Sequence, residues 1–268
     1  MCTGAVGALS HYIERSGVAT TSISLIREQS EKVGPTRALW VPYALGRPLG
    51  SSADPDFQKG VMRAAFGLLE TATEPTIADY SVESPDEAGP GQWSCPLNFA
   101  PTDATSLEAR LLAEVAGLRP WVAETRRTRG RTLFGASGAA PDQVDEVVRT
   151  LAAIAESADV TRTPEIGDGD IDWRHPMPLL LRHLADDLRS FYHEGIAAQP
   201  GAGAPNHGAL NDWIFGGTAL GETLQLIADH LTAADTGMAS IVRGLIIPEG
   251  HYKGGSAFPA TKEFGHSK

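Results

Sequence analysis

The stretch at residues 37–50, RALWVPYALGRPLG, constrains the fold most, because an apolar run breaks directly into a loop of prolines and glycines. Residues 38–41 predict a buried strand, and Pro42 ends it because proline has no N–H to offer a strand ladder. The loop that follows carries one charge, Arg47. Ligands of open α/β sheets gather outside the carboxyl ends of the strands, so we expect a binding site at this loop.

The residues before this stretch alternate between helical and strand patterns. Residues 3–16 predict a helix that ends at Gly17, residues 18–24 are rich in β-branched side chains, and residues 25–33 predict a second, short helix. This order is typical of a parallel sheet with helical connections. Four small residues predict that the first helix packs closely on a neighbour: Gly4, Ala5, Gly7 and Ala8.

Two later segments decide how far the sheet extends. Residues 71–102, rich in Pro, Gly, Ser and acidic residues, predict a surface excursion. Residues 131–136, RTLFGA, predict another short strand that turns into a helix at Ser137. Such a turn can hold an anion on its backbone amides, which makes Ser137 a candidate for substrate binding; a tight turn without a ligand is the alternative.

The carboxyl-terminal half carries apolar residues at helical spacing. Two long helices are predicted at residues 178–199 and 209–234, and their short connection makes them antiparallel neighbours. The fold class we expect is α/β, with a parallel sheet and flanking helices followed by a helical carboxyl-terminal half. The expected parts are an α/β domain at 1–157, a linker at 158–175, a helical region packed on the sheet at 176–247, and a tail at 248–268 that is disordered or ordered only against another chain.

The charge balance excludes some classes of partner. The chain has 33 Asp and Glu against 22 Lys and Arg, a formal charge of −11. Nucleic-acid binders concentrate positive charge, so no nucleic-acid partner is expected. No apolar run approaches the ~20 residues of a membrane span, and the amino terminus does not have the pattern of a secretory leader. We therefore expect a cytoplasmic protein with no membrane partner.

The two cysteines, Cys2 and Cys95, are too few for a disulfide framework. Cys2 stands at the start of the predicted first helix, where the helix dipole and free backbone amides favour a thiolate. It is therefore a candidate nucleophile, and an incidental cysteine at a chain terminus is the alternative. If Met1 is removed, the α-amine of Cys2 could also act as its base. Cys95 is interpreted as a buried small residue, with a second thiol as the alternative.

Cofactor and metal motifs are not found in the sequence. It contains neither GxGxxG nor GxxxxGK[ST], so no dinucleotide or NTP site is predicted. The eight histidines do not show the spacing of a metal site, and HExxH is absent. We predict no cofactor and no metal.

Several segments together resemble one enzyme family. They are Cys2-Thr3, GVATTSISLIRE at 17–28, RALWVPYALGRPLG at 37–50, WSCPL at 93–97, RGRTLFGASG at 129–138 and NDWIFGGTALG at 211–221. These segments resemble the substrate-specific B component of glycine, sarcosine and betaine reductases, and among them the short cysteine-containing relatives more than the selenoproteins. In that family a thiol or selenol attacks the substrate carbon next to an amine. The resemblance places Cys2, followed by Thr3, at the nucleophile.

The resemblance implies a thiol-dependent oxidoreductase, reductase-like or C–X bond-cleaving, that acts on a small amino-acid-like or carboxylate substrate. Cys2 attacks and Arg47 binds a substrate carboxylate. The other candidate substrate-binding residues are Ser24, Arg27, Glu28 and Tyr43. The alternatives are a non-catalytic subunit and a small-molecule binding protein whose sheet a partner chain completes. Because the family's strand before the nucleophile is absent here, we expect a homo-oligomer or a complex with a second chain.

Overall fold

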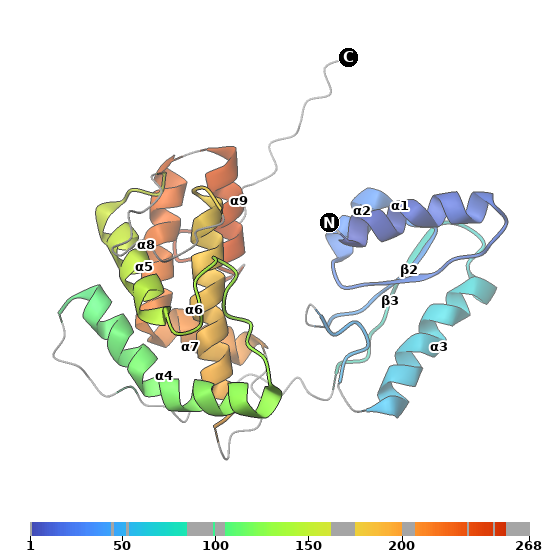
Figure 1. Cartoon of the computed structure of the whole chain (residues 1–268). Coiled ribbons are helices and arrows are strands. Elements are labelled where there is room, and N and C mark those ends of the chain that lie inside the picture. Colours follow the sequence, from blue (N-terminus) through green and yellow to red (C-terminus); the bar gives the residue numbers. More distant parts are fainter. Residues whose placement is uncertain are drawn as a thin grey trace. The chain divides into compact units, whose positions relative to one another are not determined.

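The computed structural model describes residues 2–43, 46–51, 54–84, 99, 105–161, 175–199, 207–234, 236–248 and 250–255, without the side chains of Cys2, Thr3, Glu28 and His207. The chain divides into two compact units, Met1–Gly89 and Pro90–Lys268, which are described separately (Figure 1). The division falls earlier than the expected boundary at residue 157. The reason is that helices α4 (Leu107–Arg129) and α5 (Val144–Ser157) pack on the later helices α6 (Leu179–Ala197) and α8 (Ala219–Ala234).

The amino-terminal unit contains a parallel sheet, as the sequence predicts. Its elements in chain order are α1 (Cys2–Arg15), β1 (Ser22–Ser24), α2 (Arg27–Val33), β2 (Arg37–Trp40), α3 (Pro55–Thr71) and β3 (Thr76–Asp79). In the described residues the strand order is β1-β2-β3, and Ala38 in the middle strand lies between Ser22 and Ile77. The predicted fold class, an α/β sheet with flanking helices and a mostly helical remainder, is confirmed.

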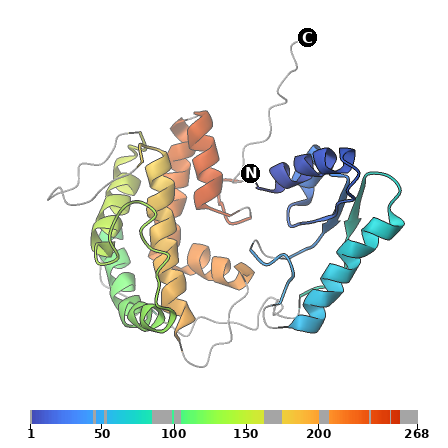
Figure 2. The same cartoon turned by 45° about the vertical axis from the view of Figure 1, so that its right-hand side comes forward.

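The two faces of this sheet differ in character. Leu39 of the middle strand and Val41, directly after it, pack on Val61 and Leu68 of α3 in an apolar core. Helices α1 and α2 lie across the opposite face (Figures 1 and 2). The Ser24 hydroxyl meets that of Ser30 in α2. One face is therefore a hydrophobic core, and the other carries the serines of β1 beneath two helices.

Helix α1 runs opposite to the strands. Near its carboxyl end, Glu14 accepts hydrogen bonds from the Thr20 N–H (2.9 Å) and from Arg37 at the start of β2 (2.5 Å). Near its amino end, a Cβ on Gly4 would lie 3.2 Å from Gln29 Nε2, and one on Gly7 would come within 2.7 Å of Val33. The close packing predicted for the four small residues is thus confirmed for Gly4 and Gly7, whereas Ala5 and Ala8 are exposed. Helix α1 begins on the side where the strands end.

The chain after α3 contains a strand that sequence reasoning missed. Residues 71–102 were expected to form a surface excursion, yet Thr76–Asp79 pairs with β2 as β3. This strand has only four residues and none of them is fully buried, so its sequence shows little apolar pattern. It is recognised as a strand by its backbone pairing with β2. Strand β1 lies at an edge of the described sheet. Completion of that edge by a partner chain stays a prediction.

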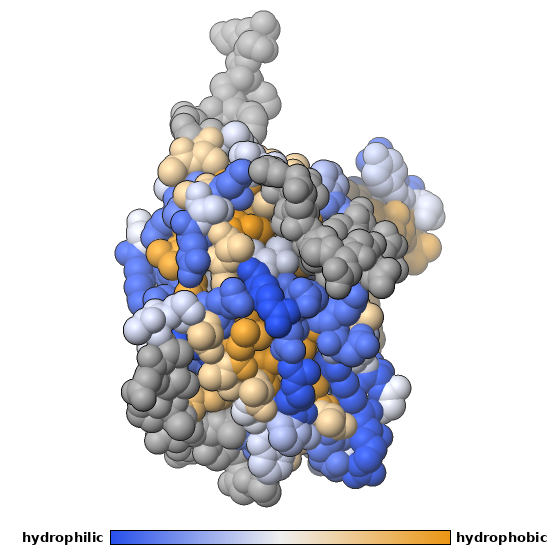
Figure 3. Space-filling model, turned by 60° about the vertical axis from the view of Figure 1, so that its left-hand side comes forward, coloured by the Kyte–Doolittle hydropathy of each residue, from blue (hydrophilic) through white to orange (hydrophobic). Residues whose placement is uncertain are grey.

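The helical unit continues from α6 with α7 (His207–Gly217), α8 and α9 (Gly237–Ile246). The long helix predicted at 209–234 is therefore two helices. Thr218 stands at the break, where its hydroxyl donates to Ile214 O (2.7 Å) and accepts from the Gly221 N–H (3.1 Å). None of the described helices meets the length and apolarity that a bilayer crossing requires. On the face drawn in Figure 3, hydrophilic residues surround patches of hydrophobic ones.

Residues 131–136, which were expected to form a strand, form a loop held by two carboxylates of α6. Asp187 accepts hydrogen bonds from the N–H groups of Gly135 (2.8 Å), Ala136 (2.7 Å) and Ser137 (3.1 Å). Glu194, two turns further along the same helix, accepts from the Leu133 N–H (2.8 Å). These backbone donors bond to side chains of α6 and not to a neighbouring strand, which explains why the segment is not part of a sheet.

Part of the predicted tail packs on its own chain. The Gln225 side chain donates to His251 O (2.5 Å) and accepts from the Lys253 N–H (3.1 Å), and Tyr252 donates to Asp229 (2.8 Å). The sequence predicts a tail that is disordered or becomes ordered only against another chain. For residues 250–255 that prediction is wrong, because they pack on α8 of their own chain. Residues 256–268 lie outside the described residues.

A buried carboxyl joins three helices of this unit. Glu114 of α4 is 8% exposed and accepts from the Tyr192 hydroxyl (2.5 Å) and from the Ala219 N–H at the start of α8 (2.8 Å). Burial raises the pKa of Glu114 above its ordinary value of 4.5, although the Ala219 N–H and Tyr192 oppose the shift. Ionisation of this group therefore opposes folding.

We expect Glu114→Gln to become more stable relative to the natural protein as pH rises. A carboxyl whose pKa is raised in the folded state adds stability below its unfolded pKa and loses that contribution as pH passes its folded pKa, whereas glutamine does not titrate. Urea unfolding at about pH 4 and about pH 8 measures the difference. Glu108→Gln, on the exposed side of the same helix, is the matched control. An equal difference at both pH values would contradict the expectation.

Candidate functional site

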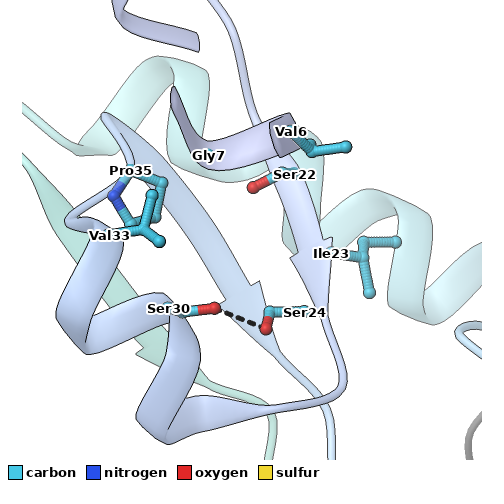
Figure 4. Close-up of a pocket in the computed structure, with 8 residues that line it drawn as sticks. All are labelled: Val6, Gly7, Ser22, Ile23, Ser24, Ser30, Val33 and Pro35. Atoms are coloured by element: carbon cyan, nitrogen blue, oxygen red, sulfur yellow. Dashed lines mark hydrogen bonds between the residues drawn. The ribbon is translucent and has the colours of Figure 1, made fainter. Parts of the chain in front are cut away.

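A small pocket lies between α1, β1 and α2 in the amino-terminal unit (Figure 4). Its volume is about 180 Å³, below the ~300 Å³ at which drug-sized ligand pockets begin, so it suits a molecule of a few heavy atoms. None of the described residues that line it carries a charge. They are Val6, Gly7, Ser22, Ile23, Ser24, Ser30, Val33 and Pro35.

Three serine hydroxyls supply the polar part of the pocket. Ser22 donates to Arg37 O (3.1 Å). The hydroxyls of Ser24 and Ser30 face each other at 2.5 Å, and both also lie within hydrogen-bond distance of Ile26 O (Figure 4). All three hydroxyl hydrogens thus have acceptors inside the protein. Ser24 also accepts from the Ile26 N–H (3.3 Å), so the oxygen lone pairs left for a ligand are mainly those of Ser22 and Ser30. A ligand with N–H donors, such as a small amine, matches this lining.

The structure brings the start of α1 to the same side of the sheet as the pocket. Cys2 is the first residue of α1, four residues before Val6, so its backbone lies about 6 Å along the helix axis from that pocket residue. The side chain of Cys2 is not among those described, so the structure places the start of the helix, and not the thiol, near the pocket. That Cys2 and Ser24 act in one site stays a prediction.

Arg27 lies at the carboxyl end of β1, but its charge is already paired. Its guanidinium contacts Asp79 (2.7 Å) and Glu31 (3.2 Å) and lies 5.9 Å from the ring centre of Trp40. It links the ends of the three strands and is not among the described pocket residues. The position of Glu28 in α2 is described, but its side chain is not.

Tyr43 and Arg47 follow β2 and lie apart from the described pocket lining. Tyr43 is buried in the core under α3, and its hydroxyl donates to Val82 O (2.8 Å). Arg47 is exposed in the loop that the sequence singled out. The loop is where the sequence predicts it, and the pocket is on the other face of the sheet.

Ser137 lies in the helical unit and is fully buried. Its hydroxyl donates to Asp187 (2.6 Å), the same carboxylate that its N–H and those of Gly135 and Ala136 contact. The turn does hold an anion on its backbone amides, and that anion is a side chain of the protein. Cys95, the second thiol considered, lies outside the described residues.

Sequence reasoning missed several pocket residues, among them Ser22 and Ser30. The signal for Ser22 is the pattern Ser22-Ile23-Ser24, which puts two hydroxyls on the strand face opposite an apolar one. Ser30 faces Ser24 because the first turn of α2 folds back over β1, and this contact is not visible as a sequence motif.

Metal-binding groups were sought among the same described residues. No cluster of three or more His, Cys, Asp and Glu side chains that could hold a metal occurs in them. His175 and His183 stack with ring centres 4.2 Å apart. Burial lowers the pKa of His183, and the positive charge of His175 lowers it further.

Comparison of the chain with known proteins finds no matching family model, no matching curated protein and no matching solved structure.

Proposed function

We propose that this protein is a thiol-dependent enzyme, reductase-like or C–X bond-cleaving, that binds a small amine-bearing molecule in the pocket beneath α1. The observation that supports it best is the position of Cys2, which begins the helix whose Val6 and Gly7 line the pocket. The resemblance to the B component of glycine, sarcosine and betaine reductases supports the same residue as nucleophile.

The chemical step is a displacement at carbon. The helix dipole and the free N–H groups at the start of α1 favour the thiolate of Cys2 over the thiol. The thiolate forms a carbon–sulfur bond as the carbon–nitrogen bond of the protonated substrate amine breaks, and the nitrogen leaves as a neutral amine with the electron pair. The serine oxygens hold the amine through its N–H groups before this step. The proposal gives no role to Arg47, because that side chain is not in the described lining.

Removal of single pocket hydroxyls should weaken binding. Ser22→Ala and Ser30→Ala each remove an acceptor from the ligand, so we expect each to lower affinity by about 1 kcal/mol, roughly fivefold. NMR titrations with methylamine and glycine measure the change. Ser16→Ala is the control, since this serine bonds to Ile13 O at the other end of α1. Unchanged affinity in both pocket variants would place the ligand elsewhere.

A non-catalytic small-molecule binding protein is the second candidate. It is favoured by one observation: the described lining contains no titratable side chain that could act as a general acid or base. The two candidates differ in their behaviour over time. Mass spectrometry would show a covalent adduct or released amine for the enzyme, and reversible binding without either for the binding protein.

A further inference from the structure

The lining of the pocket beneath α1 combines the three serine hydroxyls with four apolar side chains. The apolar ones are Val6, Ile23, Val33 and Pro35. Figure 4 shows Val33 and Pro35 together at one side of the pocket, and Val6 and Ile23 at the other. A ligand whose amine lies at the serines therefore places its remaining atoms against apolar residues, which favour carbon over polar groups.

The wall that Val33 forms is fixed in position, because Gly7 of α1 packs directly against this side chain. A Cβ on Gly7 would lie 2.7 Å from Val33 Cγ1, closer than real Cβ atoms approach other atoms, so only glycine fits opposite this valine. The same Cβ would lie 3.6 Å from Pro35 Cβ, an ordinary van der Waals distance. All three residues line the pocket, so α1 and the end of α2 meet there in direct contact. The size of the Val33 side chain decides where this wall stands.

The volume of the pocket limits the number of atoms that a ligand can bury. An apolar cavity of about 150 Å³ accepts benzene, so a pocket of about 180 Å³ has room for roughly six non-hydrogen atoms. One of them is the amine nitrogen in the function proposed above. The others form a short carbon chain.

We infer that Val33 sets the length of the carbon chain that the pocket accepts, so that the ligand is a small alkylamine. This inference rests on the proposed function, because it takes the pocket as the amine site. Val33→Ala removes two methyl-sized groups from the wall, and a longer chain then fits. The loss of Cγ1 also leaves space for a methyl group on Gly7, whose Cβ would lie 3.5 Å from the Cβ of residue 33. Gly7→Ala should therefore restore part of the wall in a Val33→Ala background.

An affinity series of straight-chain amines, from methylamine to octylamine, tests this role on the full chain. Each buried CH₂ raises affinity about fourfold, so in the natural protein we expect affinity to rise up to roughly the six-atom length of pentylamine and then to level off. In Val33→Ala the rise should continue for about two further carbons, and in Gly7→Ala/Val33→Ala for about one. Val18→Ala is the control, since Val18 is 57% exposed and lies outside the described lining. NMR titrations measure the dissociation constants.

The same series with straight-chain alcohols separates this inference from the proposed function. Alcohols meet the same wall but carry no amine. If Val33→Ala extends the length limit for alcohols, and amines bind no better than alcohols, the role of Val33 holds and the assignment of an amine site is wrong. A length limit that is the same in Val33→Ala and in the natural protein, or no binding of either series, would overturn the inference.

Discussion

Replacement of Asp187 by alanine is expected to lower the free energy of unfolding by about 3–5 kcal/mol. The carboxylate is fully buried and accepts four hydrogen bonds, three from backbone N–H groups of residues 135–137 and one from the Ser137 hydroxyl. Without it these donors have no acceptor on α6, and each unsatisfied buried donor costs roughly 1–3 kcal/mol, of which local relaxation and water recover a part. Urea unfolding followed by circular dichroism measures the loss.

The neighbouring residue Asp186 provides a matched control on the same helix. Its side chain is 29% exposed and forms ion pairs with Arg182 and Arg189. Such partly solvated pairs contribute little, so Asp186→Ala should cost at most ~1 kcal/mol. Equal and small losses in the two variants would show that the loop does not depend on the Asp187 carboxylate.

Replacement of Cys2 by serine should reduce adduct formation and amine release to background. A serine hydroxyl is not ionised near neutral pH and is a far weaker nucleophile than a thiolate. The thermal midpoint should change by no more than a few degrees, because Cys2 is the first residue of α1 and the helix packs through Gly4 and Gly7. Intact mass after incubation with a substrate panel, together with amine release, measures the effect.

Cys95→Ser separates the two thiols. If Cys2 alone attacks, this variant forms the first adduct at the normal rate, whatever happens in later turnovers. Full activity in Cys2→Ser, or loss of the first adduct in Cys95→Ser alone, would contradict the assignment of Cys2 as nucleophile.

Local sequence patterns predicted the amino-terminal unit well. The glycine that ends α1 and the proline after β2 each act within a few residues, so the bounds of α1, α2 and β2 agree with the structure to within about two residues. Strand β1, however, begins at Ser22 and not at Val18, and β3 was missed. The segment RTLFGA shows where local patterns fail. Its apolar residues fit a strand, but Asp187 and Glu194, more than fifty residues later, bind its backbone and hold it as a loop.

The candidate site was predictable in part for the same reason. Cys2 and Ser24 could be placed at a helix start and a strand end, and α1 brings those ends to one side of the sheet. Ser22 lies on the same strand face as Ser24, and Ser30 enters the pocket through the fold of α2 over β1. Arg47, the single charge in its loop, does not line the pocket beneath α1 and α2, and its contact with a ligand stays a prediction.

The central claim is that the start of α1 activates the thiol of Cys2, and the rate of alkylation by iodoacetamide as a function of pH tests it most directly. Peptide mass spectrometry of the full chain follows Cys2 and Cys95 separately in one experiment. We expect the pH midpoint for Cys2 to lie well below the ~8.5 of an ordinary cysteine thiol. A midpoint at or above ~8.5 for Cys2 would contradict the claim.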